Sequence, residues 1–114
     1  MSLTSFVNLM THKVDFIKMD RIYNGDWVEL DSNELNGFVE YGNIYTTSEN
    51  GEVLHANAIV YLDDTAIPYI DIHHENYKIN QTFPYTRNDL EVLKIDPIDD
   101  PRTGLTHHFE IYVR

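Results

Sequence analysis

The chain has 114 residues, no cysteine, and 19 acidic against 8 basic residues, which gives a formal net charge of −11. This length suits one domain with one hydrophobic core, and the lack of cysteine excludes a disulfide scaffold, thiolate catalysis and Cys-ligated zinc. The negative charge repels phosphate backbones, and no apolar run reaches the ~20 residues that cross a bilayer, so we expect a soluble protein that does not bind nucleic acid in the ordinary way.

The first third of the chain predicts a short helix followed by a β-hairpin. Apolar residues at helical spacing over 3–10 favour a short N-terminal helix or turn, and nothing there has the pattern of a signal peptide. From His12 the apolar residues alternate, which predicts a strand. The pair Asn24-Gly25 that follows is a signal for a type I′ hairpin turn.

The segment 38–62 predicts a long hairpin around a second Asn-Gly pair. β-forming residues lie on both sides of the pair, and on the return arm the apolar residues alternate from Leu54 to Leu62. The tip "TTSENGE" is polar, so we expect the hairpin, at about 41–55, to project from the core, and projecting loops on a rigid scaffold commonly carry binding functions. The candidate functional residues of this tip are Thr46, Thr47, Ser48, Glu49, Asn50, Gly51 and Glu52.

The second half of the chain predicts further short strands. They are "PYIDI", "NYKI", "LEVLKI" and "THHFEIYVR", separated by turn residues. A helical turn at 89–93 is less favoured because Val92 and Ile95 are β-branched and Asp-Pro follows. The predicted fold is all-β, a small single-domain barrel or sandwich over 1–114. The predicted core comprises Val14, Phe16, Val60, Leu62, Ile79, Val92, Ile95, Phe109, Ile111 and Val113.

Two histidine pairs raise the question of a metal site. In a strand, neighbouring side chains point to opposite faces, so the members of the pair His107-His108 cannot both reach one ion without a bulge. The same argument separates His73 from His74. A site would need one histidine from each pair and a carboxylate such as Asp71 or Glu110. We expect structural histidines and no bound metal, and a metal-binding barrel remains the alternative.

No catalytic motif is recognisable in the sequence. Phosphate-binding glycine loops, nucleophile elbows and HExxH motifs are absent, and the carboxylates are scattered. The run from Asp99 to Gly104 has the residues of a turn, with Asp at its start, Pro101 presetting φ, and Gly where φ becomes positive. We therefore expect neither an enzyme nor a cofactor.

The C-terminal pattern resembles the head-closure, or stopper, proteins and minor capsid neck proteins of tailed bacteriophages. The resemblance lies in "ANAIVYLDD", "ENYKI" and the ending "LKIDPIDDPRTGLTHHFEIYVR", and it covers about residues 53–114. In that family a short β-barrel ends with a turn of the pattern P…DP-x-TG and a His-His-aromatic-Glu strand, and a strand of the pattern A-x-A-x-V/I-x-L/Y precedes them. Residues 1–50 show no such similarity.

This resemblance implies a structural protein of the virion neck that is assembled in the host cytoplasm. Such proteins form a ring, commonly a dodecamer, between a portal or head–tail adaptor protein and a tail terminator protein. Their inner loop closes the DNA channel after packaging, and an acidic lining lets DNA pass without sticking. The candidate interface residues are Asp99, Asp100, Arg102, His107 and His108. Two alternatives remain: an adaptor or tail-completion protein without a gate, and a small metal-binding barrel or metal-dependent enzyme.

Overall fold

The structure is a computed structural model that describes residues 9–22 and 24–114, and its strands close into an antiparallel barrel. The spatial order of the strands is β1-β2-β3-β6-β5-β4. The predicted all-β fold is therefore confirmed, and the barrel is the form it takes. The helix predicted at 3–10 lies, except for its last two residues, outside the described residues. The elements are β1 (His12–Arg21), β2 (Trp27–Thr47), β3 (Val53–Asp63), the 3₁₀ helix η1 (Asp64–Tyr69), β4 (Tyr77–Phe83), β5 (Arg87–Asp99) and β6 (Thr106–Val113).

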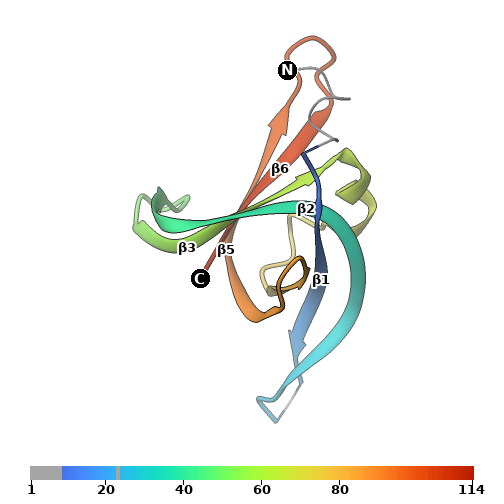
Figure 1. Ribbon diagram of the computed structural model, residues 1–114. Coiled ribbons are helices and arrows are strands. Elements are labelled where there is room, and N and C mark those ends of the chain that lie inside the picture. Colours follow the sequence, from blue (N-terminus) through green and yellow to red (C-terminus); the bar gives the residue numbers. More distant parts are fainter. Residues whose placement is uncertain (1–8, 23) are drawn as a thin grey trace.

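The strands, above all β2, are long and strongly bent, which lets this small sheet close into a barrel. β2 pairs with β1 along its first part and with β3 along its second, and Gly37 is the point of exchange, opposite both His12 and Leu62. The missing side chain matters there, because a Cβ on Gly37 would lie 2.7 Å from the carbonyl oxygen of Tyr61. Figure 1 shows the result, in which the β1–β2, β2–β3 and β5–β6 hairpins extend from the barrel in three directions.

The core agrees closely with the sequence prediction. Eight of the ten predicted core residues are buried, and Val92 and Ile95 are half-buried against the same cluster. The buried cluster also includes Tyr77, whose ring stacks on Phe16 at 4.6 Å between centroids. One polar residue, Gln81, is fully buried within the barrel; it accepts a hydrogen bond from Tyr41 Oη (2.5 Å) and donates one to the Phe83 carbonyl (3.3 Å).

The strand predicted at "PYIDI" is wrong. This stretch begins as the end of η1 and continues as an irregular loop to β4. The buried carboxylate of Asp63 caps η1 by accepting hydrogen bonds from the backbone N–H and the hydroxyl of Thr65, which starts a helical turn where a strand would continue. Beyond η1 the Tyr77 hydroxyl accepts from the N–H of Asp71 and donates to its carbonyl, which holds the loop against the barrel.

The hairpin predicted at Asn24-Gly25 is present, and Gly25 has a φ of 90° in it. The N–H of Ile22 donates to the carbonyl of Asp26 at 3.0 Å, and the N–H of Gly25 donates to the carbonyl of Ile22 at 2.9 Å. The type I′ turn stays a prediction, because residue 23 lies outside the described residues. The strands predicted at "NYKI", "LEVLKI" and "THHFEIYVR" are confirmed as β4, β5 and β6.

Candidate functional site

The tip of the β2–β3 hairpin is a tight turn with a glycine where the backbone requires one. Ser48 N–H donates to the Glu52 carbonyl at 2.8 Å, and Gly51 N–H donates to the Ser48 carbonyl at 3.0 Å. Gly51 has a φ of 82°, the left-handed region that other residues rarely adopt. The Ser48 hydroxyl also accepts from the N–H of Glu52 at 3.1 Å. This geometry leaves the carboxylates of Glu49 and Glu52 exposed.

Just behind the polar tip, apolar and aromatic side chains face solvent. Tyr45 is 69% exposed and Val53 is 72% exposed. The ring of Tyr45 stacks on His55, with 4.8 Å between centroids, and His55 Nε2 lies 3.3 Å from Asn43 Oδ1. Tyr45 and His55 therefore form an ordered ring pair on the exposed surface of the hairpin. The sequence interpretation concentrated on the polar tip and missed them.

Polar contacts of Lys94 tie the hairpin to the barrel wall. Lys94 Nζ, on β5, donates to the Thr47 carbonyl at 2.8 Å and lies 3.5 Å from the Thr46 hydroxyl. The same ammonium pairs with Asp96 at 3.3 Å. The base of the tip is thus fixed on β5, while the turn from Glu49 onward is exposed. This contact joins residues 47 positions apart, so no local sequence pattern could have indicated it.

The β5–β6 turn contains two of the candidate interface residues, Asp100 and Arg102, and they form an ion pair. The Arg102 guanidinium binds Asp100 through Nε at 3.2 Å and Nη2 at 3.1 Å, and the Arg102 N–H donates at 2.9 Å. These hydrogen bonds from Arg102 hold the pKa of the Asp100 carboxyl below its usual range. The turn closes as the sequence predicted, with Gly104 at a φ of 72°. Asp99 is exposed beside it, with its Oδ1 3.4 Å from the Thr106 hydroxyl.

His107 and His108 lie at a β-bulge, which overturns the strict alternation expected for them. Ile98 pairs with His108 and Asp99 pairs with Thr106, so His107 is the extra residue of the bulge. The two Nδ1 atoms are 2.9 Å apart, so the N–H of one ring donates a hydrogen bond to the ring nitrogen of the other. His108 Nε2 lies 3.4 Å from Glu110 Oε1. From the sequence we could say that the two rings would meet only at a bulge. The sequence gives no sign that a bulge occurs here, so the contact itself was not predicted.

The other histidine pair lies elsewhere. His73 and His74 belong to the loop before β4 and not to a strand, and His74 Nε2 lies 2.6 Å from the Met19 carbonyl. Across residues 9–22 and 24–114, no three His, Asp or Glu side chains are arranged to hold a metal ion. The alternative metal site considered from the sequence, with one histidine from each pair and a carboxylate, is not formed by these residues.

Comparison of the chain with known proteins found no relative. None of the helical segments that the structure describes has the length and hydropathy of a membrane span. No protein-family model matches the chain, and neither a curated protein nor a solved structure matches it.

Proposed function

We propose that this chain is a structural subunit of the neck of a tailed bacteriophage, where it forms a ring that closes the DNA channel after packaging and offers a docking surface to the tail. The observation that carries the proposal is the β2–β3 hairpin: a tight acidic turn, exposed at its tip and fixed at its base by Lys94. The C-terminal sequence resemblance to stopper proteins supports the same function.

A ring subunit needs separate surfaces for neighbouring subunits and for the components above and below it. The hairpins of this barrel end in exposed apolar side chains that suit such contacts, including Val53 behind the β2–β3 tip, Tyr85 in the β4–β5 turn and Leu105 in the β5–β6 turn. These side chains belong to different hairpins, so they support contacts with more than one neighbour. The proposed neighbours are further copies of the chain, a portal or adaptor protein and a tail terminator protein.

The charge of the tip fits a gate better than a DNA-binding loop. Glu49 and Glu52 are the charged residues of 46–52, and the whole chain carries −11. Carboxylates repeated around a ring repel the phosphate backbone, so DNA slides past once the gate opens. An adaptor or tail-completion protein would share the barrel and the ring, and would differ in having this hairpin away from the lumen.

The first test replaces the tip of the β2–β3 hairpin and leaves the barrel unchanged. Thr47 and Val53 are cross-strand partners, so residues 48–52 can be exchanged for a two-residue Asn-Gly turn without disturbing the Thr47 carbonyl that Lys94 binds. We expect the variant barrel to fold and to enter particles. Heads should package DNA and then lose it before tails join. Particles that retain DNA and join tails normally would refute the gating role and favour the adaptor.

A second variant tests the charge separately. Glu49→Lys with Glu52→Lys should slow DNA ejection, and the delay should shrink as salt rises because screening weakens contacts with phosphate. The matched control is Asp26→Lys together with Asp20→Lys, which makes the same change of charge at exposed positions by the β1–β2 turn. If both double variants eject DNA at the same rate, the tip carboxylates do not face DNA.

A further inference from the structure

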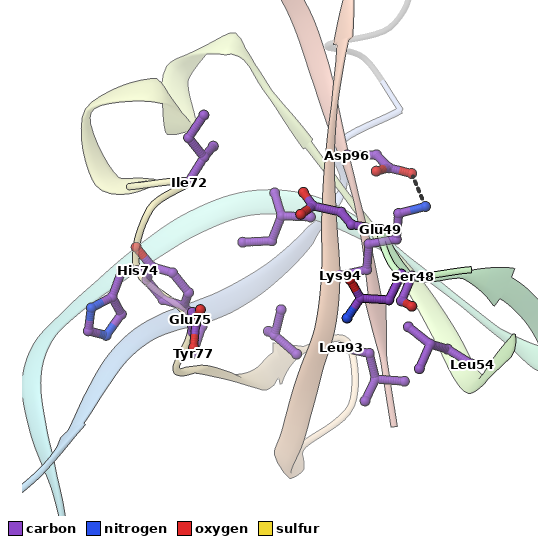
Figure 2. A pocket seen from close by; sticks show the side chains of 13 residues that line it. Ser48, Glu49, Leu54, Ile72, His74, Glu75, Tyr77, Leu93, Lys94 and Asp96 are labelled. Atoms are coloured by element: carbon purple, nitrogen blue, oxygen red, sulfur yellow. Dashed lines mark ion pairs between the residues drawn. The ribbon is translucent and has the colours of Figure 1, made fainter. Parts of the chain in front are cut away.

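A cleft of about 450 Å³ runs beside β5, where β4 and β5 separate. The loop before β4 forms one wall, β5 forms the other, and the β2–β3 tip closes one end. In Figure 2 the side chains of Ile72, His74 and Glu75 lie on one side of the view, and those of Leu54 and Leu93 lie on the other. The cleft shares Ser48, Glu49 and Asn50 with the tip proposed as a gate, whereas its loop wall has no role in the functions considered above.

The cleft follows the edge of a strand. The pairing of β4 with β5 ends at Lys78 opposite Glu91, and from Val92 onward the partner of β5 is β6 on its other side. Side chains from both faces of β5 line the cleft: Ile95 packs against the core, whereas Lys94 lies outside it. The register of β5 against β6 shifts between Val92 and Lys94, so Leu93 is a bulge residue and the side chains alternate regularly from Lys94 onward. A cleft lined by both faces of this stretch borders the backbone edge between them.

The walls of the cleft offer apolar surface on a fixed frame. Ile72 is 63% exposed and faces the cleft from the loop, and Leu54 contributes from β3. The loop is held in place by the paired hydrogen bonds between Tyr77 and the backbone of Asp71, 2.9 and 3.0 Å long. The site is therefore preformed, which lowers the entropy cost of binding.

The charges around the cleft select a basic occupant. The carboxylates of Glu49, Glu75 and Asp96 line it, whereas the one lysine of the lining, Lys94, is already bound to Asp96 and to the Thr47 carbonyl. An unoccupied strand edge can add one more strand from another protein, with backbone hydrogen bonds giving affinity and alternate side chains giving specificity.

We propose that this cleft receives an extended segment of a partner protein, which adds as a strand along residues 92–96 and carries apolar residues alternating with lysine or arginine. The apolar side chains would cover Ile72 and Leu54, and the cations would face Glu49 and Glu75. A second copy of this chain suits the site poorly, because its charge is −11. This inference does not rest on the proposed function, since it requires neither a ring nor DNA.

The probe is a short fluorescent peptide of alternating lysine and valine, measured by fluorescence anisotropy with the whole chain. Binding should protect the amides of 92–96 from hydrogen exchange. Glu49→Lys with Glu75→Lys should weaken binding by roughly tenfold, the loss expected for two partly solvated ion pairs. The matched control, Asp26→Lys with Glu29→Lys, changes charge equally at exposed positions outside the cleft lining and should bind as the unmodified chain does.

Two further measurements separate edge pairing from general attraction to an acidic protein. A peptide methylated at the backbone nitrogens that face the strand should lose binding, because it cannot donate to β5. Ile72→Asp should also abolish binding, whereas Ile67→Asp, on the exposed surface of η1, should not. Equal binding of the methylated peptide, equal effects of the two charge variants, or a concentration-dependent dimer that Ile72→Asp abolishes would overturn the proposal.

Discussion

Replacement of Gly37 by alanine is the sharpest test of how this barrel closes. A Cβ at this position would lie 2.7 Å from the Tyr61 carbonyl oxygen and 2.8 Å from Leu62 Cδ2, and Leu62 is fully buried. The strands must move apart by several tenths of an ångström, which for overpacking costs about 1–3 kcal/mol. Alanine also reduces the entropy of the unfolded chain, which returns about 0.4–1 kcal/mol. A net loss of roughly 1–2 kcal/mol of unfolding free energy follows.

Gly42 provides the matched control, because a Cβ there would meet nothing within 4 Å. Gly42→Ala should leave the unfolding free energy unchanged or raise it by up to about 1 kcal/mol. Urea unfolding followed by circular dichroism gives both values, and the slope with denaturant should stay constant. For Gly37→Ala the melting temperature should fall by roughly 4–8 °C per kcal/mol. If the two variants are equally stable, the close approach of β2 and β3 at Gly37 does not limit the fold.

Three further predictions concern polar groups. Tyr41→Phe leaves the buried Gln81 carbonyl without its hydroxyl donor and should cost about 1–3 kcal/mol of unfolding free energy in urea. The double variant Tyr41→Phe with Gln81→Leu should recover part of that loss, and additive losses from the two substitutions would show that the side chains do not interact. Arg102→Gln should raise the Asp100 pKa toward its usual range in an NMR titration, with part of the depression kept by the backbone N–H of residue 102. Because the folded pKa is depressed, the ion pair stabilises above the unfolded value of 3.8, and this stabilisation is lost as pH falls through the folded pKa. The variant should therefore lose part of this acid dependence, and an unchanged Asp100 pKa would contradict the assignment. Burial, with Glu40 and Glu110 nearby, raises the Tyr61 pKa from 10.0 to about 12, so the folded state keeps its stability below pH 10 and loses it as pH rises toward 12. The unfolding free energy of Tyr61→Phe should depend less on pH between 10 and 12, and an unchanged dependence would contradict the assignment.

The sequence determined the local features of this protein. Alternation of apolar residues located β1, β3 and β6 and their buried faces, as for Phe109 and Ile111, because a strand with one buried face must repeat with period two. Short runs between turn residues located β4 and β5. The Asn-Gly pairs located two hairpins, because glycine takes positive φ at no steric cost. The acidic turn at 46–52 was also predicted from the sequence, because a short polar run between two β-forming segments forms the turn that joins them.

Only the tertiary structure decided the features that depend on long-range contacts. The capping of η1 by Asp63 starts a 3₁₀ helix that takes up Pro68 and Tyr69 of a predicted strand, and the rest of that strand is an irregular loop. The bulge at His107 brought two side chains together that alternation would have separated. The anchoring of the tip by Lys94 and the cleft beside β5 arise where strands far apart in sequence meet or diverge. Local propensity depends on a residue and its neighbours in the chain, whereas the register of paired strands depends on how the whole barrel closes around its core.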